Sequence, residues 1–334
     1  MKAPTRSQCL AAKNDRKLSD LGNAERFLTR HGQNVLFCQK WNKWLVWDGC
    51  RWALDEMGQI RRMAQETARS IQHEVDVERD RVKRAALANW AIRSESTHAI
   101  SALIAEAQPL CVVSPSELDQ HPWLLNCRNG TLDLRTGTLR DHAREDRLTK
   151  LCPHPYDPHT SSPLWESTLE LFFHREDPDD TRDMLNFVQR ALGLSLADVV
   201  LEQKLLVAYG SGTNGKSTIL EAAKSALGPD YAQGAPRGLC VARRGESHPT
   251  ELASLFGVRL VTAIETGEGQ LFDEALVKML TGGDTITARR MREDFWTFQP
   301  SHTLWMATNH KPRVKGVEQG DCTISHYPSS TFSR

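Results

Sequence analysis

One glycine-rich stretch limits what this chain can fold into. Residues 205–218 read LLVAYGSGTNGKST, an apolar run followed by a glycine-rich turn and the start of a segment with helical spacing. Four positions fit the phosphate-binding pattern G-x-x-x-x-G-K-[ST], namely Gly210, Gly215, Lys216 and Ser217. A chance glycine-rich turn is the alternative. The apolar run before the turn and the helical pattern after it favour a phosphate-binding loop between a strand and a helix.

The chemistry of such a loop explains its residues. Glycines let the backbone N–H groups turn toward a polyphosphate, and the following helix presents its positive N-terminal end. We expect Lys216 to reach the β- and γ-phosphates of ATP and the Ser217 hydroxyl to hold Mg²⁺. The predicted nucleotide-binding residues are Gly210, Ser211, Gly212, Thr213, Asn214, Gly215, Lys216, Ser217 and Thr218.

Two further apolar runs each end in a polar residue suited to ATP chemistry. The run from Val258 to Ile264 is a predicted strand that ends at Glu265, and Glu268 follows in TGEG as a second candidate acid. A carboxylate at the end of a neighbouring strand suits Mg²⁺ or the attacking water. The run SHTLWMAT ends at Asn309, which we expect to orient water against the γ-phosphate. An ordinary turn asparagine is the alternative reading of Asn309.

Composition gives broader limits. A length of 334 residues favours two domains, and 42 basic against 42 acidic residues give no sign of a nucleic-acid partner, which would require a local patch. The start MKAPTRSQCL contains no apolar signal segment, and no apolar run is long enough to span a membrane. Eight cysteines without a C-x-x-C pair favour reduced thiols in the cytoplasm.

The first half of the chain alternates between helical and strand-like text. Ser19 is expected to cap a helix that stops near Gly32, and a β-meander with four tryptophans follows. The tryptophans suit either a small core or nucleobase stacking, and we favour the core. Helices are predicted at about 60–80 and 82–107. A basic run in these helices suits either a solvated face or a DNA-binding helix, and we favour the solvated face. The run contains Arg79, Arg81, Lys83, Arg84 and Arg93.

Short strands with tight turns at Asn129-Gly130 and Thr136-Gly137 are predicted over 109–155. A proline-rich crossing then marks the domain boundary. Cys152, His154 and His159 lie close together in this crossing, but their spacing matches no zinc pattern. Two helices with apolar stripes, over about 163–173 and 181–195, lead into the glycine-rich stretch.

Four segments in this order carry a resemblance to a known family: GSGTNGKST, RLVTAIETGEG, LVKMLTGGDTITAR and TFQPSHTLWMATNHKP. They closely resemble phage and plasmid primase–helicases, which belong to the superfamily III helicases, an AAA+-related class. Upstream, DLGNAERF, WLVWDGCRW, NCRNGTLDL and YDP resemble the module that precedes the helicase in these proteins and in the poxvirus primase–helicase.

The resemblance implies an α/β fold with four parts. These are a flexible arm at 1–18, an N-terminal α+β module at 19–160, a P-loop AAA+-like superfamily III helicase core at 163–315 with a parallel sheet flanked by helices, and a divergent tail at 316–334. It also implies a hexameric ring that uses ATP and Mg²⁺ to move on single-stranded or forked DNA in replication, together with phage or plasmid replication proteins in the cytoplasm of a bacterial host.

The resemblance assigns roles by motif. Lys216 and Ser217 take the Walker A roles, Glu265 the Walker B position and Asn309 the sensor position. Which of Glu265 and Glu268 holds Mg²⁺ and which polarises water is left open. A DNA-contacting hairpin and its surroundings are expected to include Lys278, Arg289, Arg290 and Arg292.

Two departures from the family modify this expectation. The chain begins too late to hold an upstream primase domain, so no primase activity is expected. Cys322-Thr323-Ile324 stand where a Trp-Arg-Arg segment with the arginine finger is expected, so hydrolysis is expected to be impaired. The alternatives are a nucleotide-dependent DNA-binding or oligomerisation subunit without productive hydrolysis, and an unrelated phosphate-loop kinase or metabolic ATPase.

Overall fold

The chain has a mixed α/β fold that divides into two compact units. The computed structural model describes residues 17–210, 215–236, 238–242, 249–265, 271–289 and 295–310. The first unit comprises Met1–Gln120 and Ala143–Thr149, and the second comprises His121–His142 and Lys150–Arg334. Among the described residues, no helix is both long and apolar enough to cross a membrane.

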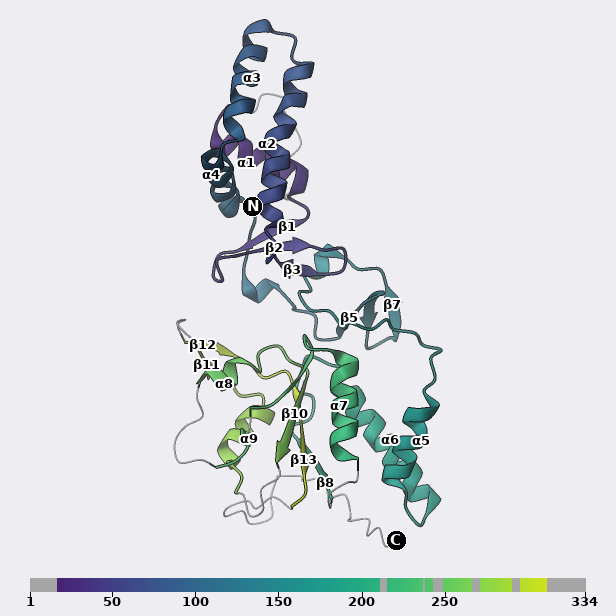
Figure 1. The fold of residues 1–334 in the computed structure, drawn as a ribbon. Helices are drawn as coiled ribbons and strands as arrows, with labels where there is room; N and C mark the ends of the chain where they lie inside the picture. Colours follow the sequence, from purple (N-terminus) through teal and green to yellow (C-terminus); the bar gives the residue numbers. More distant parts are fainter. Residues whose placement is uncertain are drawn as a thin grey trace, which may run out of the picture. The chain divides into compact units, whose positions relative to one another are not determined.

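In the first unit, helices pack together beside a small sheet (Figure 1). The sheet order is β3-β2-β1-β4. Its strands are β1 (Val35–Cys38), β2 (Lys43–Trp47), β3 (Trp52–Leu54) and β4 (Val112–Val113). The helices are α1 (Asp20–His31), α2 (Gln59–Val77), α3 (Arg81–Ser94) and α4 (Thr97–Ala107), with short 3-10 turns η1 (Gln108–Leu110), η2 (Pro115–Glu117) and η3 (Arg144–Asp146).

Local signals explain most of these boundaries. The Ser19 side chain accepts a hydrogen bond from the Gly22 backbone N–H at 3.1 Å, which confirms the predicted cap of α1. The single helix predicted over 82–107 is wrong, because α3 ends at Ser94 and α4 begins at Thr97. The Ser96 hydroxyl accepts from the Ala99 N–H and caps α4, so a serine inside a helical pattern starts a new helix here.

The tryptophans of the meander pack within the first unit. Trp52 is buried and its ring lies edge-on against Trp47 with centroids 5.7 Å apart. Trp44 lies against Phe27 and Phe37, and the Trp52 indole N–H donates to the Arg144 carbonyl at 2.9 Å. These contacts support the core role for Trp44, Trp47 and Trp52.

The second unit contains a parallel sheet. Its strand order is β8-β13-β10-β9, and each neighbouring pair runs parallel. Figure 1 shows β8, β13 and β10 side by side with α7 beside them. The strands are β8 (Leu205–Tyr209), β9 (Ala232–Gly234), β10 (Leu260–Glu265) and β13 (Thr303–Thr308).

Apolar side chains cover both faces of this sheet. Along β13, Leu304 and Met306 join one buried cluster, which includes residues of α9 (Glu274–Thr281). Trp305 and Ala307 alternate with them and join another cluster, which includes residues of α7 (Lys216–Leu227). A sheet buried on both faces is the arrangement that parallel strands require.

The remaining elements of this unit surround the sheet. An antiparallel sheet of order β5-β6-β7 contributes to the same cluster as α7. Its first turn consists of Arg128 and Asn129, one residue before the predicted Asn129-Gly130 pair, and its second turn contains the predicted Thr136-Gly137. The elements are β5 (Leu124–Cys127), β6 (Gly130–Asp133), β7 (Thr138–Arg140), α5 (Pro163–Phe173), α6 (Pro178–Leu194), α8 (Pro249–Ala253), and the antiparallel pair β11 (Ile286–Ala288) and β12 (Trp296–Phe298).

Candidate functional site

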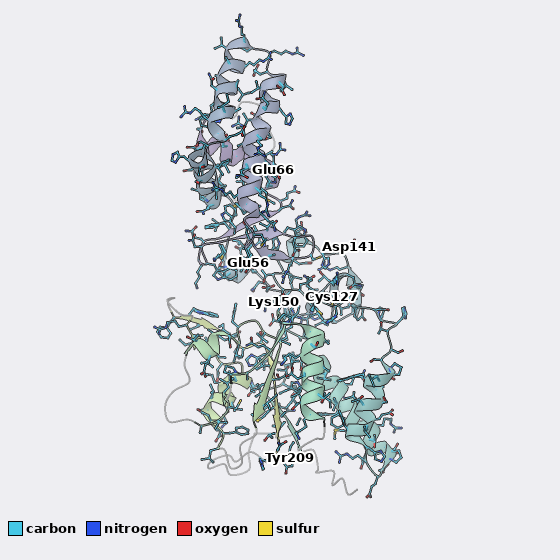
Figure 2. All side chains as sticks on the ribbon, viewed as in Figure 1. Glu56, Glu66, Cys127, Asp141, Lys150 and Tyr209 are labelled. Carbon is cyan, nitrogen blue, oxygen red and sulfur yellow. The ribbon has the colours of Figure 1, made fainter. Side chains whose placement is uncertain are left out.

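The sheet brings three predicted site segments to one edge. Tyr209 at the end of β8 pairs with Thr308 at the end of β13, and Thr308 pairs with Glu265 at the end of β10. Figure 2 marks Tyr209 at this edge. Because the three strands are parallel, the glycine-rich loop and Asn309 both begin at the edge where β10 ends in Glu265. The carboxyl edge of a parallel sheet is where ligands bind in open α/β folds.

The loop and the helix after it are joined by a left-handed residue. Gly215 has φ +76° and precedes α7, and no side chain of the described residues caps this helix start. The first N–H groups of a helix lack intrahelical partners, so the start of α7 suits an anion. Ser217 and Thr218 in the first turn are exposed to solvent.

Lys216 is the first residue of α7, and its side chain reaches back toward the end of β8. Its ammonium group donates a hydrogen bond to the Gly210 carbonyl at 2.7 Å, across the loop. Partial burial lowers the pKa of Lys216 from its ordinary value, because desolvation disfavours the charged form. A phosphate at the start of α7 would offer this ammonium group an anionic acceptor in place of the carbonyl.

A backbone network joins the loop to the end of β13. The Gly210 N–H donates to the Thr308 carbonyl at 3.4 Å, which extends the parallel ladder by one residue. The Thr308 hydroxyl donates to the His310 carbonyl at 2.9 Å and accepts from the His310 N–H at 3.2 Å. This turn holds the backbone of Asn309 beside the first residue of the glycine-rich loop.

The Phe172 ring packs closely against Gly215, and the sequence did not predict this contact. A methyl group on Gly215 would overlap the Phe172 ring, which comes from the last turn of α5. Phe172 was expected only as part of an apolar stripe. The helices before the glycine-rich stretch therefore reach the loop itself, and no local sequence pattern indicates such a long-range contact.

Several predicted site residues lie outside the described residues. These are Ser211, Gly212, Thr213, Asn214, Glu268, Arg290 and Arg292, together with the tail from residue 311 onward. For Glu265 the structure places the backbone at the end of β10 but does not describe the side chain. The choice between Glu265 and Glu268 as Mg²⁺ ligand stays open.

The described cationic residues of the expected DNA hairpin and its surroundings lie on α9 and directly after β11. Lys278 is exposed and pairs with Glu274 one turn earlier at 2.7 Å. Arg289 follows β11, is exposed, and lies over the Phe295 ring at 4.8 Å from its centroid. The antiparallel pairing of β11 with β12 confirms the predicted hairpin.

The described residues contain no group of three or more His, Cys, Asp or Glu side chains arranged to hold a metal ion. Cys152 instead bonds to the Ala226 carbonyl at 3.2 Å.

Two family models match the chain. A model described as D5 N terminal like matches residues 24–174, and a family of unknown function, DUF5906, matches residues 208–322. The second match contains the glycine-rich loop and all three strand ends of the candidate site.

Curated viral proteins match as well. The chain is 28% identical over 204 residues to a "Putative helicase" of Acanthamoeba polyphaga mimivirus, covering 61% of this chain and 21% of that protein. It is 24% identical over 220 residues to a "Putative primase" of African swine fever virus, covering 64% of this chain and 22% of that protein. This chain is therefore similar to viral proteins named as a putative helicase and a putative primase. It spans about a fifth of the length of these relatives.

A "Putative helicase" of Invertebrate iridescent virus 3 matches as well, with 26% identity over 206 residues that cover 59% of this chain and 22% of that protein. Among solved structures, the apo C terminal region of NrS-1 matches with a TM-score of 0.43 and 10% identity, over 82% of this chain and 53% of that chain. A match at this level supports no inference about fold or activity.

Proposed function

We propose that this chain is the ATP-binding and ATP-hydrolysing part of a superfamily III primase–helicase that acts in phage or plasmid DNA replication. The observation that carries the proposal is the single row of strand ends, Tyr209, Thr308 and Glu265. This row supports a site in which a phosphate loop, an acid and a polar sensor residue act on one nucleotide.

The chain's residues fit a polyphosphate with Mg²⁺. The uncapped start of α7, the Lys216 ammonium and the exposed Ser217 hydroxyl lie together after a left-handed glycine. In the proposal, Lys216 would exchange the Gly210 carbonyl for the β- and γ-phosphates, and Ser217 and Glu265 would hold Mg²⁺. Asn309 orients the attacking water, which Glu265 or Glu268 polarises.

A Mg²⁺ ion held by Ser217 and Glu265 would neutralise negative charge that develops on the phosphates. The protein's part is to hold the phosphates on backbone N–H groups and to orient the water. Helix N-termini and a lysine supply this stabilisation without rearranging during the reaction, because they are fixed by the fold.

ATP turnover tests the proposal. Hydrolysis is measured for the wild type and for Glu265→Gln, with and without single-stranded DNA. We expect Glu265→Gln to retain ATP binding and to lower turnover at least tenfold, because the amide keeps the shape but loses the charge. Wild-type turnover that needs a small-molecule acceptor would instead indicate a kinase and would overturn the proposal.

Binding without any turnover in the wild type would favour a nucleotide-dependent DNA-binding or oligomerisation subunit. The prediction of impaired hydrolysis depends on residues after His310, which lie outside the described residues, and it stays a prediction.

DNA is the proposed second ligand, in a ring of subunits. Names of relatives as primases and helicases support this, as does the exposed Arg289 at the β11–β12 hairpin. Arg289→Ala is expected to weaken single-stranded DNA binding and to make its salt dependence shallower by roughly 0.7 for each phosphate that the protein no longer neutralises. Arg182→Ala is the matched control, since Arg182 is exposed on α6 and pairs with Asp179 at 2.9 Å. Equal salt slopes for wild type and Arg289→Ala would remove Arg289 from the DNA interface.

A further inference from the structure

Two cysteines of the second unit lie beside each other in its buried core. Cys127 ends β5, and the Cys152 backbone N–H donates to the Asn126 carbonyl at 2.7 Å. The Arg128 N–H donates to the His154 carbonyl at 3.1 Å, so ladder-like bonds flank both cysteines. Neighbouring backbones joined in this way lie about 5 Å apart, which is within the range of Cα separations in disulfides.

Each of the two thiols also changes the pKa of the other. A hydrogen bond from Cys127 to Cys152 lowers the pKa of the Cys152 thiol, and the backbone N–H of His154 lowers it further. The same contact, together with burial, raises the pKa of the Cys127 thiol. The Cys152 thiol therefore loses its proton more readily than the Cys127 thiol, the division that an attacking and a resolving cysteine need.

The pair is joined to the helix that begins at the candidate nucleotide site. Cys152 donates from its thiol to the Ala226 carbonyl, in the last turn of α7, at 3.2 Å. Pro153 lies so close to Gly228, directly after α7, that a methyl group there would overlap its ring. The Leu151 N–H adds a bond to the Asp230 carboxylate at 3.0 Å.

We propose that Cys127 and Cys152 form a redox-active pair that closes to a reversible disulfide on reaction with a small hydroperoxide. A small oxidant is required, because the side chains are only 4% and 6% exposed. Closure also removes the thiol proton that Cys152 donates to Ala226, so the oxidation state changes a bond at the end of α7.

The reaction balances in two steps. The Cys152 thiolate attacks one oxygen of hydrogen peroxide, which breaks the O–O bond and yields a sulfenic acid and hydroxide. The Cys127 sulfur then attacks the Cys152 sulfur, the S–O bond breaks, and water leaves with the Cys127 proton. Two thiols and one peroxide give one disulfide and two waters, and dithiothreitol reverses the change.

Peptide mapping of the full chain tests this proposal. The reduced protein is treated with one to five equivalents of hydrogen peroxide, quenched, unfolded and alkylated with N-ethylmaleimide. We expect digestion to release a Cys127–Cys152 cross-linked peptide that disappears after dithiothreitol. Cys240→Ser is the matched control, because Cys240 is also buried and its loss is expected to leave the cross-link unchanged.

A second variant separates a redox pair from accidental oxidation. In Cys127→Ser, Cys152 lacks a resolving partner and is expected to gain two or three oxygens instead of forming a cross-link. Circular dichroism checks that the variant is folded. If the variant is not folded, the peptide map of the wild-type protein alone decides the proposal. Full alkylation of both thiols while the partly exposed Cys50 is oxidised would overturn the proposal, and so would a cross-link between other cysteines.

Discussion

At the scale of single residues, Gly215 is a position in the candidate site where backbone conformation and packing both disfavour a side chain. Gly215→Ala places a methyl group in a left-handed conformation and against the Phe172 ring. Left-handed strain costs about 1 kcal/mol, and overpacking adds about 1–3 kcal/mol. We expect urea unfolding to show that the variant is less stable by about 2–4 kcal/mol, and we expect weaker ATP binding.

Gly283 supplies a control for this substitution. Its φ is +79°, and within the part of the chain that the structure describes no atom lies within 4 Å of a methyl group placed there. Gly283→Ala therefore measures the left-handed strain alone, about 1 kcal/mol. Equal losses of stability at the two positions would show that Phe172 does not press on the loop.

His302 is a second residue whose environment has a measurable consequence. It precedes β13, is buried, and neither ring nitrogen has a hydrogen-bond partner within the described residues. Burial lowers its pKa from 6.5 to about 4. The folded state therefore takes up this proton less readily than the unfolded state. Its neutral form stabilises the fold above pH 6.5, and that contribution is lost as the pH falls from 6.5 toward 4.

The expected size of this pH effect is about 3 kcal/mol, from about 1.36 kcal/mol for each pH unit over the shifted range. Urea unfolding at about pH 7 and about pH 4.5 measures the difference in free energy of unfolding between the two pH values, for the wild type and for His302→Met. The variant is expected to lose less stability between the two values. The same loss in both proteins would mean that other groups cause the acid sensitivity.

At the scale of elements, Arg259 joins parts of the second unit that are far apart in the sequence. Its guanidinium is buried and donates to the Leu196 carbonyl at 2.7 Å and the Leu124 carbonyl at 2.6 Å, and it lies over the Tyr231 ring at 4.6 Å. It therefore ties the start of β5 and the end of α6 to the parallel sheet.

Arg259→Lys is expected to destabilise the protein by about 2–4 kcal/mol, although the charge is kept. A single ammonium cannot reproduce the planar fork that reaches two carbonyls, and a buried cation with fewer partners is costly. Urea unfolding measures the loss of stability, with the exposed Arg182→Lys as a control that costs less than about 1 kcal/mol. A near-neutral Arg259→Lys would contradict this role.

Local secondary structure was easier to predict from the sequence than the order of the strands in the sheet. The strand Leu205–Tyr209 and the helix Lys216–Leu227 were predictable because an apolar run and helical periodicity are local signals. The order β8-β13-β10-β9 was not, since β13 comes from the far end of the described chain and lies between β8 and β10. The contact of Phe172 with Gly215 and the buried His302 depend on the same long-range packing.

At the scale of the whole molecule, family matches and compact units divide the chain differently. The D5 N terminal like match runs to residue 174, yet residues 121–142 pack in the second unit. Asn126 donates from its backbone N–H to the Tyr231 hydroxyl at 3.2 Å, and Leu125 and Leu132 join the cluster on the α7 face of the sheet. The predicted boundary at 160–163 therefore passes through contacts of this unit.

A fragment that starts at His121 is expected to be more stable than one that starts at Pro163. The shorter fragment loses the Leu124 carbonyl that Arg259 binds and exposes the apolar side chains that β5 and β6 cover. Thermal unfolding and resistance to proteolysis compare the two fragments. A shorter fragment of equal stability would show that the β5–β7 sheet is not needed by the parallel sheet.

The central claim is that a nucleoside triphosphate binds where β8 meets α7. Isothermal titration calorimetry of the full chain with ATP and Mg²⁺ tests this claim most directly. The proteins compared are the wild type, Lys216→Ala and Lys224→Ala. Lys224 lies at the other end of α7 and pairs with Glu221 at 2.7 Å, so it controls for loss of a lysine from the same helix. We expect Lys224→Ala to bind like the wild type and Lys216→Ala to lose at least tenfold in affinity, since it removes a charged contact to phosphate. Equal affinity of all three proteins, or no binding by the wild type, would contradict the account.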